Sequence, residues 1–394
     1  MDETKKSAAQ GTQTEIIYDE LGPEYVIEVY DPKLNFRGVA VLDNLNLGIA
    51  KGGIRMTGTV NPIEVSRLAR AMSYKNAMAG LPFGGGKSGI MVDPKGMSLN
   101  KKKAIIESFA KMLRPFVPKY YIAGPDINTT EREMMWFADA HGDWESCTGK
   151  PANYVSRKNG KTRRGLPHEL GSTGFGVALS AKVALEHLEM KLKGAEVTIA
   201  GYGNVGVFAH KFLEEWGALV VAVSDSSGTI YDRSGLNYAK LMKAKAKTGS
   251  VLSYPVSTTS KKLTRDIIYE LSTDVLIPAA GPDVINATNV DRVKAKIIVE
   301  GANIPMREEF EKILHRKNVL IIPDFVANAG GVISSYAEYM GYDSVKMFKL
   351  VEGKIVPNVK EMLLSVGKGS GMPRDAAIRI AKRRILAGKA PFRK

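Results

Sequence analysis

The chain has 394 residues, of which 44% are hydrophobic, so it can bury the cores of two domains. Its formal net charge of +15 suits an anionic substrate, a nucleic acid or simply a basic cytosolic protein. Cys147 is the only cysteine, which excludes an internal disulfide and a metal site built on cysteines. The sequence contains no long apolar run and its first residues are polar. We therefore expect no transmembrane helix, no secretory signal and a cytoplasmic location.

The first part of the chain predicts strands followed by a helix. Residues 23–60 alternate apolar and polar positions in short stretches, with turn residues between them, which is typical of strands. Residues 61–79 repeat apolar positions at helical spacing. Asn61 can cap this helix, Glu64 stands where a capping box requires it, and Gly80 is expected to end it.

The stretch AGLPFGGGKSGI at residues 79–90 places Lys87 directly after three glycines. One interpretation is a phosphate-binding loop, but Leu81 stands where that motif requires its first glycine. The other interpretation is a reactive lysine in a glycine-rich loop, where small neighbours let a ligand approach closely. The stretch alone does not decide between them.

After residue 170 the sequence reads as a strand, a glycine turn, a helix and a second strand. Gly201, Gly203 and Gly206 form G-x-G-x-x-G between the first strand and the helix, and Asp225 ends the second strand. This is the context of a dinucleotide-binding fingerprint. Asp225 favours NAD because it can bond a ribose 2′-hydroxyl, whereas Ser226 and its serine neighbours could accept a 2′-phosphate. Both NAD and NADP therefore remain possible.

Further strands are expected at 274–278, 297–299 and 319–322, with helices between them, and the last 50 residues are expected to be helical. Strands that alternate with helices predict a doubly wound parallel sheet. The fold class is thus α/β with two domains, the second of them Rossmann-like.

Two basic segments account for part of the positive charge. One is SRKNGKTRRG, which contains the basic loop 157–164, and the other is the C-terminal tail from Lys382. We expect both to be solvated. A nucleic-acid-binding function is a disfavoured alternative, because no aromatic side chains alternate with these charges to stack on bases.

Eight stretches occur in an order that resembles the glutamate/leucine/phenylalanine/valine dehydrogenase family. Between about residues 51 and 340 they read KGGIRM, SYKNAMAGLPFGGGKSGI, GPDINT, GSTGFGV, AGYGNVG, LIPAA, VEGAN and FVANAGGVISSY. The resemblance implies a reversible NAD(P)-dependent oxidative deamination of an amino acid. It also implies a substrate-binding and oligomerisation domain over 1–178, onto which helices 345–394 pack back, and a dinucleotide-binding domain over 179–344.

The resemblance implies roles for individual residues. Lys87 is expected to be the catalytic lysine, with a pKa lowered by burial and nearby positive charge, and Asp126 the carboxylate that transfers protons. Lys75 would hold the substrate α-carboxylate, and Lys51 and Ser335 its distal carboxylate. The other implied substrate positions are Gly53 and Gly124, and the implied cofactor positions are Gly201, Gly203, Asn204, Val205, Gly206, Asp225, Ser226, Thr173, Ala280, Asn303 and Asn328.

The substrate can be argued from the distal pocket. Against an apolar side chain, Lys51 and Ser335 would each remain unpaired, at about 1–3 kcal/mol per group. This favours L-glutamate, with 2-oxoglutarate and ammonia as products, bound in a cleft between the domains. A dehydrogenase of leucine, phenylalanine or valine is the alternative, because Glu169 stands where the family commonly has arginine and Ala337 where an aromatic is common. Family members are commonly homohexamers, so a homo-oligomer is expected.

Overall fold

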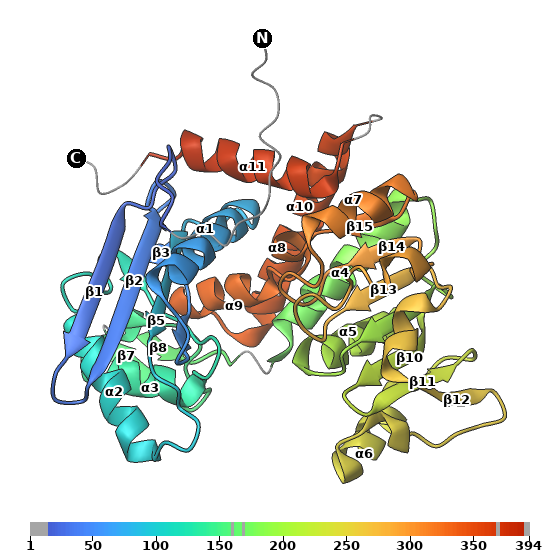
Figure 1. Cartoon of the computed structure of the whole chain (residues 1–394), viewed down its shortest axis with the longest axis horizontal. Helices are drawn as coiled ribbons and strands as arrows, with labels where there is room; N and C mark the ends of the chain where they lie inside the picture. Colours follow the sequence, from blue (N-terminus) through green and yellow to red (C-terminus); the bar gives the residue numbers. More distant parts are fainter. Residues whose placement is uncertain (1–14, 159–160, 168–169, 368–370, 390–394) are drawn as a thin grey trace. The chain divides into compact units, whose positions relative to one another are not determined.

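The computed structural model describes residues 15–158, 161–167, 170–367 and 371–389, which group into two compact units (Figure 1). The first unit contains the described parts of 1–73, 83–147 and 385–394, and the second those of 74–82 and 148–384. Each unit contains its own main β-sheet. No helix within these residues is long and apolar enough to cross a membrane.

The first unit is built on a six-stranded sheet in the order β1-β2-β5-β3-β6, with β4 also paired to β5. Its strands are β1 (Tyr25–Asp31), β2 (Phe36–Asn44), β3 (Ala50–Lys51), β4 (Ile54–Met56), β5 (Gly84–Ile90) and β6 (Tyr121–Ile122). Its helices are α2 (Leu99–Met112), α3 (Glu131–His141), η1 (Trp144–Ser146) and most of α1 (Pro62–Met78). Helices α2 and α3 pack against each other.

The predicted glycine loop around Lys87 is instead β5, a strand buried along its whole length. It pairs with β2 on one side and with β3 and β4 on the other. Positions 85, 87 and 89 face the same side of the sheet, because successive residues of a strand point to opposite faces. A Cβ at Gly85 would lie 2.1 Å from Ser73 Oγ in α1, and one at Gly89 would lie 2.8 Å from Val60 Cγ2. The glycines therefore let the segment 60–73 pack close to the sheet, and the phosphate-loop interpretation is wrong.

Helix α1 follows most of its sequence signals. The side-chain oxygen of Asn61 accepts the backbone N–H of Glu64 at 3.0 Å, and Gly80 adopts a φ of +61° just beyond the helix. The predicted capping box is only half formed, because the Glu64 carboxylate accepts a hydrogen bond from Arg55 in β4. An ion pair with a neighbouring strand therefore takes the place of the return bond to the cap.

The second unit contains a seven-stranded sheet in the order β12-β11-β10-β9-β13-β14-β15. The predicted parallel sheet is confirmed for β9, β10, β13, β14 and β15, while β11 and β12 extend it antiparallel at one edge. The strands are β9 (Glu196–Ala200), β10 (Leu219–Asp225), β11 (Gly228–Asp232), β12 (Ser260–Leu263), β13 (Val275–Pro278), β14 (Ile297–Val299) and β15 (Leu320–Ile322).

Helices of the second unit cover this sheet and pack on one another. Helix α4 contacts α5, α9 and α10, and α7 packs on β15. The helices are α4 (Ser172–His187), α5 (Asn204–Glu215), α6 (Tyr238–Thr248), α7 (Glu308–Arg316), α8 (Asp324–Ala327), α9 (Gly330–Tyr339), α10 (Ser344–Val366) and most of α11 (Pro373–Ala387), with short turns η3 (Val251–Ser253), η4 (Arg265–Glu270) and η5 (Val290–Arg292).

The compact units and the predicted domain limits divide the chain differently. The second unit takes in residues 74–82, its long segment begins at residue 148, ahead of the predicted boundary at 178/179, and it includes α10. Helix α4 is buried on nearly all sides by α5, α9 and α10, which accounts for its place in this unit.

The basic segment 157–164, predicted as a loop, contains a hairpin instead. Strands β7 (Val155–Lys158) and β8 (Lys161–Arg164) pair antiparallel. Residue Glu169, at which the sequence departs from the family pattern, lies outside the described residues.

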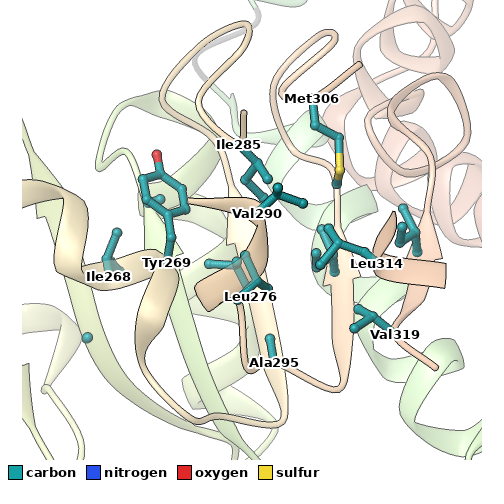
Figure 2. Packing of buried hydrophobic residues seen from close by; sticks show 14 residues of the cluster. Ile268, Tyr269, Leu276, Ile285, Val290, Ala295, Met306, Leu314 and Val319 are labelled. Atoms are coloured by element: carbon teal, nitrogen blue, oxygen red, sulfur yellow. The ribbon is translucent and has the colours of Figure 1, made fainter. Parts of the chain in front are cut away.

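The core of the second unit includes a cluster on the side of the sheet where β13, β14 and β15 lie. Figure 2 shows Leu276 in this cluster with Val290 and Ile285 nearby, and Leu314 contributes from α7. Leu276 is 1% exposed. Buried aliphatic side chains of this kind supply most of the stabilisation of such a sheet through the apolar area they remove from water.

Replacing Leu276 with alanine is expected to lower the free energy of unfolding by about 2–5 kcal/mol, because the packed cluster cannot fully collapse around the lost methyl groups. Urea unfolding followed by circular dichroism measures the change. The matched control is Leu364→Ala on α10, where the side chain is 78% exposed and the expected change is within about 0.5 kcal/mol. Equal effects of the two substitutions would contradict this account of the core.

Candidate active site

Lys87 and Asp126 form a close ion pair in the first unit. The Lys87 Nζ lies 3.0 Å from Asp126 Oδ2, and only 8% of the lysine side chain is exposed. Lys87 extends from the middle of β5, between the two glycines that admit segment 60–73. The lysine is thus fixed by a strand paired on both edges, which limits its freedom to move away from the carboxylate.

Asp126 stands in a turn after β6 that is fastened to β4. The Asp126 N–H donates to Thr129 Oγ1 at 2.9 Å, and the Thr129 hydroxyl donates to the carbonyl of Ile54 at 2.6 Å. The Gly124 carbonyl accepts the Ile54 N–H at 2.8 Å. A Cβ at Gly53 would lie 2.8 Å from Asp126 Cβ, so glycine at 53 permits the close approach of this turn. Gly53 and Gly124 therefore support the position of the carboxylate.

Arg55 is a member of this site that the sequence analysis did not identify. Its Nε lies 2.9 Å from Asp126 Oδ2, the same oxygen that Lys87 contacts, and its Nη1 lies 2.6 Å from Glu64 Oε1. Arg55 pairs with Gly89, two residues beyond Lys87 on β5. The motif KGGIRM contained the arginine, but only the strand register places it on the same face as the lysine.

The surroundings shift the pKa values of both partners. Burial lowers the pKa of Lys87, and the positive charge of Arg55 adds to this, so that together they outweigh the opposite effect of Asp126. Burial alone would raise the pKa of Asp126, but the charges of Lys87 and Arg55 outweigh it and hold that pKa below its usual value. The neutral amine of Lys87 thus becomes more accessible, while Asp126 stays ionised.

Lys51 lies on the same face of the sheet as Lys87. It pairs with Gly85 on β5, two residues before Lys87, and its side chain is buried. The Nζ donates to the carbonyl of Ala123 at 2.9 Å. An ammonium group has three donors, so a buried lysine in this position can also bind a carboxylate. The first unit therefore gathers Lys51, Lys87 and Asp126.

Lys75, Asn303 and Asn328 meet at one oxygen in the second unit. The Asn303 Oδ1 accepts from Lys75 Nζ at 3.2 Å and from Asn328 Nδ2 at 3.0 Å. Thr173 lies in the first turn of α4, and Ser335 is buried on α9. The predicted residues are thus divided, because Lys51, Lys87 and Asp126 belong to the first unit and the others discussed in this paragraph to the second.

A cavity of about 740 Å³ opens at the carboxyl ends of β9, β10 and β13. Strands β10 and β13 lie on opposite sides of β9, so the strand order reverses at this point of the sheet. Open α/β sheets bind ligands at such a switch point. The predicted residues that line the cavity are Gly201, Gly203, Asp225, Ser226 and Ala280.

The three fingerprint glycines differ in what their missing side chain permits. Gly201 has a φ of +103°, and a Cβ there would lie 2.4 Å from the backbone of Ala280. A Cβ at Gly206 would lie 2.1 Å from the Gly201 carbonyl, so this glycine permits close packing of α5 on the turn. A Cβ at Gly203 would meet open space within 4 Å. The backbone at Gly203 is therefore accessible to a ligand, and Asn204 and Val205 open α5 directly after it.

This arrangement fits a dinucleotide. The N-terminus of α5 offers backbone N–H groups and a positive dipole end to a pyrophosphate, and the glycine turn leaves room for it. An acidic and a hydroxyl side chain stand further along the cavity, at the end of β10.

Comparison with known proteins agrees with the two-part α/β fold. Residues 23–142 match the family model for the Glu/Leu/Phe/Val dehydrogenase dimerisation domain, and residues 165–386 match the model for Glutamate/Leucine/Phenylalanine/Valine dehydrogenase. A glutamate dehydrogenase of Aeropyrum pernix is 39% identical over 368 residues, which are 89% of this chain and 85% of that protein.

Two further relatives extend the comparison. The NADP-specific glutamate dehydrogenase of Saccharolobus shibatae is 38% identical over 80% of this chain and 75% of its own length. The hetero-hexameric glutamate dehydrogenase of Thermus thermophilus, solved in a leucine-bound form, superposes with a TM-score of 0.79 at 27% identity, covering 92% of this chain and 88% of its own. The chain therefore belongs to the glutamate/leucine/phenylalanine/valine dehydrogenase family of amino-acid dehydrogenases.

Proposed function

We propose that the protein catalyses the reversible oxidative deamination of L-glutamate to 2-oxoglutarate and ammonia with NAD or NADP. The observation that carries this proposal is the buried Lys87–Asp126 pair, 3.0 Å apart, with a second buried lysine on the same face of the sheet. Relatives that are 38–39% identical bear the name glutamate dehydrogenase, which supports this choice of substrate.

The cofactor would be held in the cavity of the second unit. The turn at Gly201 and Gly203 and the first turn of α5 would bind the pyrophosphate. When bound, the nicotinamide supplies the hydride acceptor for the substrate Cα–H.

Lys87 and Asp126 would manage the protons of the reaction. Neutral Lys87 accepts a proton from the water that attacks the substrate imine carbon, and burial makes that neutral form accessible. Asp126, ionised at rest and 3.0 Å from Lys87, takes this proton from the lysine and passes it to the departing nitrogen, so that both groups return to their deprotonated forms. Arg55 contacts Asp126 Oδ2 and is a positioning residue, because it fixes the carboxylate and keeps it ionised.

Lys51 and Lys75 would bind the two carboxylates of glutamate, with Ser335 supporting the distal one. The distal carboxylate of glutamate would bring a negative charge to the buried ammonium of Lys51, whereas an apolar amino acid would bring none. We also propose a homo-oligomer, in keeping with the dimerisation-domain match and with the hexameric relative.

The direct test incubates purified protein with 2-oxoglutarate, ammonia and either NADH or NADPH. Loss of the near-ultraviolet absorbance of the reduced nicotinamide is the expected result. A folded protein that binds the cofactor yet reduces leucine- or phenylalanine-derived 2-oxo acids faster than 2-oxoglutarate would contradict the proposed substrate.

Lys87→Met is expected to lower kcat by a factor of about 10²–10⁴, because the reaction loses a positioned proton acceptor. Affinity for the cofactor, measured by fluorescence titration, should not change, since the fingerprint lies in the other unit. The control is Lys33→Met, which removes the same charge from an exposed position of the first unit. A Lys87→Met enzyme with most of its turnover would remove the lysine from the mechanism.

Arg55→Met is expected to shift the pH profile of kcat/KM to higher pH. Loss of the guanidinium raises the pKa of Asp126, which its charge holds down, and also raises the pKa of Lys87, which its charge helps to lower. Both groups act in deprotonated forms, so each requires a higher pH than before. Arg37→Met, at an exposed ion pair of the same sheet, should leave the profile in place. A uniform loss of activity without a shift would indicate a purely structural role for Arg55.

Lys51→Met is expected to lower kcat/KM for glutamate by about tenfold to a hundredfold, the worth of a hydrogen bond between charged groups. The value for norvaline, which lacks the distal carboxylate, should change little. Steady-state kinetics with both substrates measure the difference. An equal loss for the two would place Lys51 outside the distal subsite.

A further inference from the structure

The carboxylate at the end of β10 is already bound by the protein itself. Asp225 Oδ1 accepts the Ser227 N–H at 2.9 Å, and its Oδ2 accepts the Val251 N–H at 2.8 Å. Lys245 Nζ lies 3.3 Å from the same Oδ2. Asp225 therefore holds the turn between β10 and β11 against the start of η3.

This use of Asp225 limits what it can offer a ribose. A carboxylate has about four lone-pair positions, and three of them are occupied by these contacts. Only 10% of the side chain is exposed. A ribose whose two hydroxyls donated to both carboxylate oxygens would have to displace either the Val251 amide or Lys245 from Oδ2. The fingerprint carboxylate is thus poorly suited to select NAD by its diol.

Lys245 presents a positive charge at the same place. It extends from α6 into the wall of the cavity beside Asp225 and Ser226, and 25% of its side chain is exposed. Its Nζ lies 5.7 Å from the centre of the Tyr202 ring, a distance typical of a cation–π contact that steadies the side chain. One of its three donors faces Asp225, so two remain for a ligand.

A 2′-phosphate on the ribose would neutralise the positive charge of Lys245, whereas a 2′-hydroxyl would not. A phosphate monoester carries about −1.5 to −2 charges at pH 7 and accepts several hydrogen bonds. Arg265 also lines the cavity, although Asp266 pairs with it at 2.8 Å. Ser226 is exposed in the turn that Asp225 holds and adds a hydroxyl donor.

We propose that this cavity selects NADP over NAD, with Lys245 donating to the 2′-phosphate and Asp225 fixing the turn that carries Ser226. The inference rests on the proposed function, because it takes the cavity to be the dinucleotide site. It goes beyond that function by assigning the cofactor choice to a lysine outside the glycine fingerprint.

The test measures binding directly and needs no turnover. Fluorescence titrations give the Kd of NADPH and of NADH for the wild-type chain, for Lys245→Ala and for Lys247→Ala. The control Lys247→Ala removes the same charge from an exposed position of the same helix. Calorimetry with adenosine 2′,5′-bisphosphate and with adenosine 5′-monophosphate isolates the subsite from the nicotinamide.

The wild-type chain should bind NADPH and the bisphosphate at least about tenfold more tightly than their counterparts without the 2′-phosphate, as expected for a hydrogen bond between charged groups. Lys245→Ala should remove this preference and leave NADH binding unchanged, which also shows that the variant is folded. Lys247→Ala should keep the preference. If the wild type binds NADH as tightly as NADPH, or more tightly, the role of Lys245 is overturned and the proposed function stands. Binding of neither dinucleotide overturns the proposed function as well.

Discussion

The proposed chemistry depends on one oxygen, Asp126 Oδ2, that two cations share within a buried sheet face. Lys87 and Arg55 reach it from neighbouring strands, and Glu64 balances the second cation from α1. With the lysine charged, the four groups sum to zero, which is the condition under which so many charges can be buried together. Loss of a proton from Lys87 leaves a net negative cluster that attracts a proton back. The group is therefore suited to take up and release one proton.

This cluster is possible only because β5 consists largely of glycine. Each glycine on the face of Lys87 removes a Cβ that would collide with segment 60–73, so helix and sheet approach within reach of the charged groups. The lysine is the one long side chain among residues 84–87. The motif thus describes a packing surface with a single long side chain, and not a flexible loop. Its rigidity suits the proposed chemistry, since a positioned group loses little conformational entropy when it reacts.

In the second unit, Asp225 also combines a structural role with a place in the proposed binding site. Its carboxylate satisfies backbone amides from two segments and holds a lysine at the cavity wall. A residue type that usually indicates NAD supports the opposite proposal here, because three of its four lone-pair positions are already occupied within the protein. Residue identity at a fingerprint position is informative only together with the partners that surround it.

The sequence by itself determined the α/β class, the order of the five parallel strands after residue 196, the dinucleotide fingerprint and the family, because hydrophobic period, glycine spacing and motif order are local properties of the chain. It also singled out Lys87 and Asp126. Only the tertiary structure decided that residues 84–90 form a strand, that Glu64 pairs with Arg55, and that Arg55 stands beside Asp126 and Lys245 beside Asp225. Those facts depend on strand register and on contacts between residues up to 71 positions apart, which no local pattern encodes.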